Sequence, residues 1–427
     1  MRTALNTADH FTLMIDYEIR KSGLSGNFCA LVFELDQKLD PESLAIQSEG
    51  FLERFPEANV RLKQQGRRYF WQPYTQGASI FFTHQAKHQD SAHRIIQSIM
   101  NTKVSTYDAV PVTFHLINLP TGSFFLLRWF HPICDAKGAE LIVHYFLHDN
   151  ETPPKAQSPF TQLTNKWGFW KKLGMMYKAK KHIGQLDQTS SSLPNIQETP
   201  ADKLDYTLLK INVETSKIIM KHAMKEVGMT GTSLYFIGCL MRALAKIGCQ
   251  ENEGFCVPYA MNMRKRKALS PIFGNQVSFL FAQATMEQVQ DRKKLFKSLR
   301  EQHKTTIRTG LDQALVPLMW AGSWLPLEKY GAIIRNTPQG RERSSFWFSY
   351  TGEPDPQVTE VANARVKTMF QLSQVTSPPS LGVLVSQYSG EITLSFNYIA
   401  SQIQHEWLDK FMQQLTKELL NDSEDIT

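Results

Sequence analysis

A segment near the middle of the chain, residues 150–204, interrupts an otherwise regular succession of strand and helix patterns. It shows little hydrophobic periodicity at either end, and its prolines and serines include Pro153, Pro154, Ser190, Ser191, Ser192, Pro194 and Pro200. Clusters of this kind mark connecting segments. The chain has 427 residues, which is more than one hydrophobic core usually sustains. We therefore predict an N-terminal lobe over 1–150, a crossover linker over 151–204 and a C-terminal lobe over 205–427.

Both halves mix strand and helix patterns. Apolar or alternating runs predict strands over 28–35, 67–74, 111–119, 123–131, 204–213, 257–266, 273–283, 344–352, 380–388 and 390–399. Helical spacing of apolar residues predicts helices over 39–55, 93–104, 139–147, 215–228, 232–248 and 406–420. In the helix over 215–228, Thr215 is the expected cap and Gly228 the expected stop. The pattern predicts an α/β protein with two similar lobes.

A histidine and an aspartate lie four residues apart where the predicted strand over 123–131 ends. The sequence there is HPICDAKG, in which His131 and Asp135 precede a turn at Lys137 and Gly138. Histidine suits proton transfer because its pKa lies near working pH. The same histidine could instead be a core residue whose ring bonds to a backbone carbonyl, so the pair by itself does not decide a function.

The stretch HPICDAKG resembles the HxxxDG motif of the chloramphenicol acetyltransferase-like superfamily. This superfamily includes the condensation domains of non-ribosomal peptide synthesis, plant BAHD acyltransferases, polyketide-associated acyltransferases and bacterial wax ester synthases. Three further segments are similar to family segments and keep their order: LDPESLAIQSEGFLERFPEANVRL, MNMRKRKALSPIFGNQVSFLF and LGVLVSQYSGEITLSFNY. The chain departs from the pattern at Phe130, where condensation domains usually have a second histidine, and at Ala136, where the family has glycine. The DFGWG motif of the plant enzymes is absent.

The resemblance implies two chloramphenicol acetyltransferase-like lobes, each a mixed sheet flanked by helices, with an active-site tunnel at the lobe interface. It implies an acyltransferase that moves an acyl group from a thioester donor to an alcohol or an amine, with His131 as the general base. Asp135 would support the site through a salt bridge to Arg264, although Arg128 and Arg266 are also candidates. Gly138 would support the same loop, and Asn275 and Ser278 would bind substrate or the oxyanion. Gly274-Asn275 could also be a simple turn.

Two other functions stay open. A stand-alone condensation-type amide synthase would act on carrier-bound donors, but the chain lacks a carrier domain and an adenylation domain. A catalytically silent relative would serve as a binding module, and the intact His131 and Asp135 argue against it.

Composition restricts the partners. The net charge of +7 is mildly basic, which suits an anionic donor such as acyl-CoA but is too diffuse to imply nucleic acid. We expect no permanently bound cofactor, and acyl-CoA or the phosphopantetheine thioester of an acyl carrier protein as the donor. The other partner is a small-molecule acceptor, and we expect a monomer.

The five cysteines are scattered, without a CxxC pair, which predicts a reduced cytoplasmic protein. We expect no secretory signal and no membrane-spanning segment.

Cys134 could act as a nucleophile, but a buried inert thiol is the favoured interpretation. Glu140, His144 and His148 have metal-ligand spacing on one helical face, yet ordinary helix packing is favoured and no metal is expected.

A basic and aromatic segment, residues 166–182, lies inside the predicted linker. It could be a helix packed across the lobes with its lysines in solvent, an interfacial helix on an anionic membrane, or a docking site for an acidic acyl carrier protein. We predict the first, with the aromatic side chains covered by the protein. Membrane contact is possible on this composition but is not expected.

Overall fold

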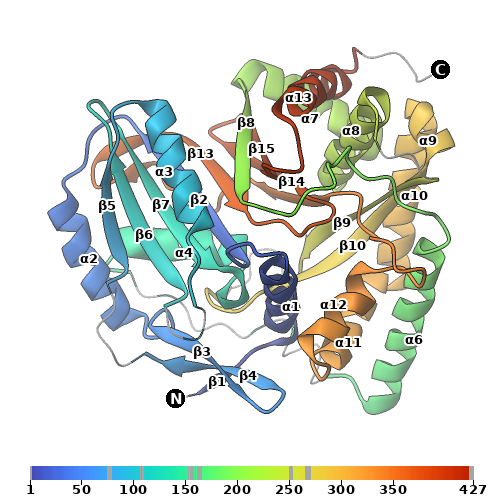
Figure 1. Cartoon of the computed structure of the whole chain (residues 1–427), viewed down its shortest axis with the longest axis horizontal. Coiled ribbons are helices and arrows are strands. Elements are labelled where there is room, and N and C mark those ends of the chain that lie inside the picture. Colours follow the sequence, from blue (N-terminus) through green and yellow to red (C-terminus); the bar gives the residue numbers. More distant parts are fainter. Residues whose placement is uncertain are drawn as a thin grey trace.

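A computed structural model describes residues 2–74, 79–105, 107, 110–151, 153, 158, 160, 166–249, 253–264 and 271–422. The chain forms two lobes side by side, each built around a six-stranded sheet, with helix α1 (Thr7–Lys21) lying between them (Figure 1). The predicted α/β class and the predicted two-lobed arrangement of mixed sheets flanked by helices are confirmed.

The sheet of the N-terminal lobe has helices on both faces. Its strands lie in the order β12 (Glu360–Val361), β13 (Ala364–Ser373), β2 (Phe28–Leu35), β7 (Ser123–Phe130), β6 (Val112–Asn118) and β5 (Phe81–Gln85). Helices α2 (Pro41–Arg54) and α4 (Ala136–Leu147) cover one face, and α3 (Gln89–Asn101) covers the other. The alternation within β2 decides these contacts, because Leu31 and Phe33 point to the first core and Ala30 and Val32 to the second.

Two strands from the C-terminal part of the chain belong to this N-terminal sheet. β13 pairs antiparallel with β2, and β12 pairs with β13. The predicted division at residues 150 and 204 therefore does not describe the sheets completely, since 360–373 was assigned to the C-terminal lobe. A strand pattern cannot show which sheet a strand joins when its partner is more than three hundred residues away.

The C-terminal lobe is a sheet with its main helices on the outer face. Its strands lie in the order β10 (Val277–Thr285), β9 (Gly254–Asn262), β11 (Trp347–Gly352), β14 (Leu381–Tyr388), β15 (Glu391–Ile399) and β8 (Leu204–Ile211). The helices of this lobe are α6 (Phe169–Leu186), α7 (Val213–Val227), α8 (Thr232–Ile247), α9 (Met286–Gln290), α10 (Arg292–Thr309), α11 (Leu311–Gly322), α12 (Leu327–Arg335) and α13 (His405–Leu420). A buried ion pair connects α8 to α13, with Nε of Arg242 2.7 Å from Oε2 of Glu418.

Helix α1 connects the lobes. It contacts α11 and α12 of the C-terminal lobe as well as the short 3₁₀ helix η1 (His131–Ile133) of the N-terminal lobe. A small sheet of β1 (Thr3–Ala4), β4 (Arg68–Pro73) and β3 (Val60–Gln65) lies below it in the view of Figure 1. The sequence patterns did not predict α1, because buried polar residues such as Asp9 and Asp16 break its apolar face.

Three local predictions were wrong. Lys137 and Gly138, which were expected to form a turn before the helix, lie in the first turn of α4. The cap of α7 is Asn212, whose side chain accepts a hydrogen bond from the Thr215 amide, so Thr215 lies inside the helix. The aromatic residues of 166–182 are only partly covered: Trp167 is buried, but Phe169, Trp170 and Tyr177 are exposed. The helix begins at Phe169 and turns the side that carries Ala179 and Leu186 to the protein, so these three aromatics fall on or near its outer side.

Across the described residues, no helix by itself combines the length and apolarity that a membrane span requires. Only α7 and α8 taken together reach that level of length and composition, and they are bent by 97° at their junction.

Candidate active site

His131 lies where β7 ends and the chain turns into η1. Its backbone is held from two directions, because its amide donates to the Asn27 carbonyl at 2.9 Å and its carbonyl accepts from Nδ2 of Asn275 at 2.9 Å. Asn27 precedes β2 of the N-terminal lobe, whereas Asn275 precedes β10 of the C-terminal lobe. Both lobes therefore fix the position of the histidine.

Asp135 is buried and caps α4. Its Oδ1 accepts from the Gly138 amide at 3.0 Å, and its Oδ2 accepts from the Gln276 amide and from Nη1 of Arg264, each at 2.7 Å. The carboxylate thus joins the start of α4 to two segments of the C-terminal lobe. Such charge-assisted bonds are shorter and stronger than neutral ones.

Of the three arginines considered as partners of Asp135, Arg264 forms the ion pair. Arg128 donates to the Thr102 carbonyl instead and lies over the ring of Phe28. Arg266 lies outside the described residues. The resemblance implied a salt bridge from Asp135 with Arg264 as the first of three candidates, and that pair is present. The folded chain shows in addition that it joins the two lobes.

Gly138 permits a close approach between α4 and the segment before β10. A Cβ atom at this position would overlap the backbone carbonyl of Ile272 and the side chain of Cys134. In the family motif the glycine directly follows the aspartate, where this chain has Ala136. Here the close contact is made by Gly138, two residues later in the same first turn of α4.

The segment 272–276 lies against the histidine loop. Gly274, whose φ of +82° favours glycine, donates its amide to the Ile133 carbonyl at 2.7 Å and forms a parallel bridge with Cys134. Asn275 and Gln276 follow and are fully buried. Gly274 and Asn275 thus do more than form a turn, because they carry the contacts that hold His131.

Asp9 of α1 completes this network, and the sequence patterns did not single it out. Its Oδ1 accepts from both the amide (2.6 Å) and Nδ2 (2.9 Å) of Asn275, and its Oδ2 accepts from the Asn6 amide at 2.9 Å. Burial raises the pKa of Asp9 from 3.8 to about 6, although these hydrogen bonds oppose the change. The only sequence signal is the capping box formed by Asn6 and Asp9.

The same contacts revise the predicted role of Asn275. Its Nδ2 donates to Asp9 and to the His131 carbonyl, so both amide protons are used inside the protein. An amide without a remaining donor cannot stabilise an oxyanion. Asn275 is therefore placed to position His131, and it does not line the chamber described below.

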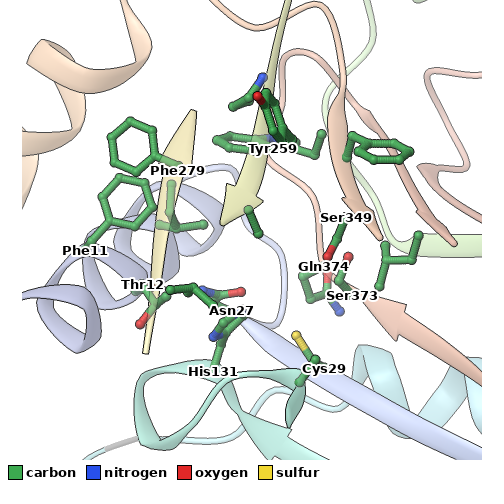
Figure 2. Close-up of a pocket in the computed structure, with 18 of the residues that line it drawn as sticks. Phe11, Thr12, Asn27, Cys29, His131, Tyr259, Phe279, Ser349, Ser373 and Gln374 are labelled. Carbon is green, nitrogen blue, oxygen red and sulfur yellow. Dashed lines mark hydrogen bonds between the residues drawn. The ribbon is translucent and has the colours of Figure 1, made fainter. Parts of the chain in front are cut away.

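The ring of His131 borders a chamber between the two lobes. Figure 2 shows the ring directed into this space from the loop below it, between Asn27 and Cys29. Burial lowers the pKa of His131 from its usual 6.5, while its own carbonyl, Asp135 and the Asn275 side chain favour the protonated ring. Within the described residues, Nδ1 is buried and makes no hydrogen bond. A neutral imidazole near pH 7 is free to accept a proton.

The chamber has a volume of about 210 Å³ and a mostly apolar wall. Residues from both sheets and from α1 line it, among them Phe11, Thr12, Asn27, Cys29, Tyr259, Phe279, Ser349, Ser373 and Gln374 (Figure 2). The rings of Phe11 and Phe279 stack at 4.8 Å across the lobe interface. A largely apolar chamber with a few polar groups is the usual form of a small-molecule site.

Two polar residues of the chamber differ in what they can offer a ligand. Ser278 lines the wall, as its predicted role requires, but its hydroxyl donates to the Asp312 carbonyl at 3.3 Å. Gln371 of β13 also lines the wall, is buried, and has an Nε2 with no hydrogen-bond partner among the described residues. A buried donor without a partner is costly unless a ligand satisfies it. No sequence pattern pointed to Gln371.

A second hollow lies behind the chamber, between β9, α10 and the start of α8. Its volume is about 890 Å³, and Tyr259 and Ala260 border both spaces. The Tyr259 hydroxyl is 3.0 Å from Nδ1 of His303. The wall also carries Arg308 and Lys304, and Nζ of Lys304 forms an ion pair with Oε1 of Glu301 at 3.3 Å. Two cationic side chains and one carboxylate thus line a space that adjoins the chamber.

The remaining candidate side chains have structural contacts. Cys134 is buried, and burial raises the pKa of its thiol. The thiol therefore stays protonated, which fits the favoured interpretation of an inert cysteine. Glu140 bonds to Lys137 at 2.8 Å, Nε2 of His144 lies 2.9 Å from Glu151, and His148 bonds to the His144 carbonyl. The described ranges contain no group of three metal-ligating side chains.

Comparison with solved structures identifies the fold. The trichothecene 15-O-acetyltransferase from Fusarium sporotrichioides matches with a TM-score of 0.74 and 11% identity, over 98% of this chain and 95% of that chain. The first condensation domain of the calcium-dependent antibiotic synthetase, in complex with a substrate analogue, matches with a TM-score of 0.71 and 11% identity, over 100% and 98%. The starter condensation domain of rhizomide synthetase, a mutant in complex with C8-CoA, matches with a TM-score of 0.67 and 11% identity, over 99% of this chain and 95% of that chain.

The chain therefore has the fold of the chloramphenicol acetyltransferase-like superfamily, and the resemblance inferred from its motifs is confirmed at that level. No protein-family model matches the chain, and no curated protein matches its sequence. At 11% identity the likeness establishes the architecture, and the reaction remains to be argued from the site.

The Asp135 network can be tested through stability. In Asp135→Asn, an amide NH₂ must face a backbone amide or Arg264, and the guanidinium loses its ion pair. We expect the free energy of unfolding to fall by about 3 kcal/mol, measured by urea denaturation. Asp291 is a matched control, because it caps α10 in the same way through the Lys294 amide but its side chain is 38% exposed. Asp291→Asn should change stability by less than about 0.5 kcal/mol, since asparagine caps nearly as well. Unchanged stability of Asp135→Asn would contradict the structural role.

The raised pKa of Asp9 predicts a specific pH dependence. Because the folded-state pKa (about 6) exceeds the usual 3.8, protonation of Asp9 favours the folded state. This contribution is fully present below about pH 3.8 and is lost as the pH rises through about 6. Relative to Asp9→Asn, which cannot titrate, the wild type should lose about 2 to 3 kcal/mol of stability across this interval and none above about pH 7. A stability difference that does not vary from pH 4 to pH 7 would show that the pKa of Asp9 is not raised.

Proposed function

We propose that this protein is an acyltransferase that moves an acyl group from a thioester donor to an alcohol or an amine, with His131 as the general base. The observation that carries the proposal is the position of His131, whose backbone is held by both lobes and whose ring is directed into an apolar chamber. Burial lowers the pKa of this ring, which favours the neutral form that a base requires. The fold is shared with an acetyltransferase and with condensation domains, one of them in complex with an acyl-CoA, which supports the same class of reaction.

The proposed step follows from the geometry. The acceptor O–H or N–H lies beside His131 and attacks the thioester carbonyl carbon while the ring takes its proton. The base nitrogen is Nε2, because Nδ1 is buried. A tetrahedral oxyanion forms, the carbon–sulfur bond then breaks, and the departing thiolate receives the proton from the imidazolium. A base placed in this way contributes about 10²- to 10⁴-fold to the rate.

The oxyanion needs a donor that is in place before the reaction. We assign this role to the side-chain amide of Gln371, which lines the chamber wall; its Nε2 has no partner among the described residues but is buried, so the side chain must turn toward the substrate to donate. Asp135, Asn275 and Asp9 act as positioning residues, because their contacts go to the backbone of the histidine loop and its neighbours.

The donor is proposed to approach through the second hollow. Arg308 on its wall suits the phosphate groups of acyl-CoA or of a phosphopantetheine arm, and Lys304 would have to leave its ion pair with Glu301 to join it. Tyr259 borders both this space and the chamber. The acceptor would then reach His131 from the side of α1 and the chamber. No cofactor is required, since the thioester already carries the activated acyl group.

Replacement of the base should abolish most of the activity without affecting the fold. In His131→Ala we expect turnover to fall by about 10²- to 10⁴-fold. Turnover would be measured as thiol release from a panel of acyl-CoAs and acyl-loaded carrier proteins mixed with pooled alcohols and amines, and the products would be identified by mass spectrometry. His148→Ala is the control, because His148 is an exposed histidine at the end of α4. Near-full turnover in a folded His131→Ala protein would refute the proposal.

The pH dependence of the reaction should report the same histidine. Because burial lowers the pKa of His131 below 6.5, the acidic limb of the kcat/KM profile should lie below pH 6.5. Asp9 also titrates near pH 6, so Asp9→Asn distinguishes the two groups. If His131 is the base, the limb persists in Asp9→Asn, whereas a limb that disappears in that variant would assign the titration to Asp9.

A further inference from the structure

The outer side of α6 exposes large aromatic side chains. Trp170, Tyr177 and Phe169 are 81%, 71% and 66% exposed. Trp170, Leu173 and Tyr177 are spaced at i, i+3 and i+7, so they share one face of the helix. The helix packs against α11 through its opposite side, which carries Ala179 and Leu186. Apolar stripes of this kind normally face the core, so this one requires an explanation.

Two tryptophans of the neighbouring segment enlarge this surface. Trp320, in the last turns of α11, and Trp324, just after it, are 36% and 49% exposed, and their rings lie 6.2 Å apart. Nζ of Lys172 lies 5.4 Å from the centre of the Trp320 ring, which places the end of α11 beside α6. We call Phe169, Trp170, Leu173, Tyr177, Trp320 and Trp324 the aromatic face.

Lysines surround these side chains without acidic residues among them. Helix α6 contains Lys171, Lys172, Lys178, Lys180 and Lys181 and no aspartate or glutamate. In the ranges that the structure describes, none of these lysines forms an ion pair. Lys178 is occupied by the Thr309 carbonyl, while Lys171, Lys180 and Lys181 are exposed. The helix therefore presents a net positive charge around exposed indole and phenol rings.

We propose that the aromatic face and its lysines form a docking surface for an anionic lipid bilayer. Tryptophan and tyrosine favour the bilayer–water boundary, where their rings are buried and their polar edges stay hydrated. Lysines beside them are attracted by anionic headgroups. An acidic carrier protein would account for the lysines, but it would leave the three most exposed aromatics of a convex helix without a function. This inference goes beyond the proposed acyl transfer and does not depend on it.

The aromatic face is connected to the chamber through α11. Helix α11 contacts α1 at the lobe interface. The backbone carbonyl of Asp312 in α11 accepts a hydrogen bond from the hydroxyl of Ser278, which lies in the chamber wall. In Figure 1, α6 lies on the outer side of α11. A bilayer bound at the aromatic face would therefore lie on the outer side of a helix pair that reaches the chamber only indirectly, through the contact of α11 with α1 and the hydrogen bond from Ser278 to Asp312.

The test is sedimentation of the full chain with vesicles, which requires no knowledge of substrates. Vesicles of phosphatidylcholine alone are compared with vesicles that also contain phosphatidylserine, at low and at physiological salt. We expect binding to the anionic vesicles that weakens with salt, and little binding to the neutral ones. The triple variant Lys171→Gln, Lys180→Gln, Lys181→Gln and the double variant Trp170→Ala, Tyr177→Ala should each lower the binding constant about tenfold or more.

A second helix provides the matched control. Helix α7 exposes Lys217, Lys221 and Lys225 together with Ile218 and Met224, but it exposes no aromatic ring. The triple glutamine variant of these α7 lysines should bind within about twofold of the wild type. His131→Ala should also bind as the wild type does, so a failure of the proposed chemistry is distinguishable from a failure of the proposed docking.

Four results would overturn the proposal. The first is no binding to anionic vesicles at low salt. The second is an equal loss of binding in the α6 and α7 lysine variants, which would indicate diffuse charge attraction. The third is a dimer in sedimentation equilibrium that dissociates in the Trp170→Ala, Tyr177→Ala variant, because a second copy would then cover the face. The fourth is binding of a purified acidic acyl carrier protein, lost in the α6 variants, without vesicle binding.

Discussion

The carboxylate of Asp135 is the interaction on which the candidate site depends. It accepts from the start of α4, from the Gln276 amide and from Arg264, so a single buried group fixes the histidine loop against the C-terminal lobe. A buried carboxylate is unfavourable unless every lone pair finds a donor. The observed relative position of the lobes brings Arg264 and Gln276 to it, and other positions would leave the carboxylate without these donors. The chamber exists because that position leaves space between the two sheets.

A second carboxylate holds the same loop from the other side. Asp9 holds Asn275 by backbone and side chain, and Asn275 in turn holds the His131 carbonyl. Helix α1 thus takes part in the site although none of its side chains contacts the imidazole by a hydrogen bond in the described structure. A histidine fixed through its backbone needs little reorganisation when substrates arrive, which is what general-base catalysis and electrostatic stabilisation require.

Much of the architecture could be predicted from local patterns. Strands such as 28–35 and the hairpin of 111–119 with 123–131 were found because their side chains alternate between two apolar cores or face one continuously. Elements that face both a core and a polar network were missed. Helix α1 carries Asp9, His10 and Asp16 on buried positions, and β13 joins a sheet formed mainly by the other end of the chain. A window of neighbouring residues contains neither kind of information.

The sequence by itself determined many of the elements and indicated His131 and Asp135 as the candidate pair. The spacing of His131 and Asp135 at the end of a strand is a local property, and so is the run of lysines and aromatics in 166–182. Only the tertiary structure decided that Arg264 pairs with Asp135 and that Asp9 and Asn275 hold His131. It also decided that Nε2 of Gln371 has no partner among the described residues and that Trp170 and Tyr177 face solvent. The physical reason is that hydrogen bonding and burial depend on which distant segments meet, whereas periodicity depends on neighbours along the chain.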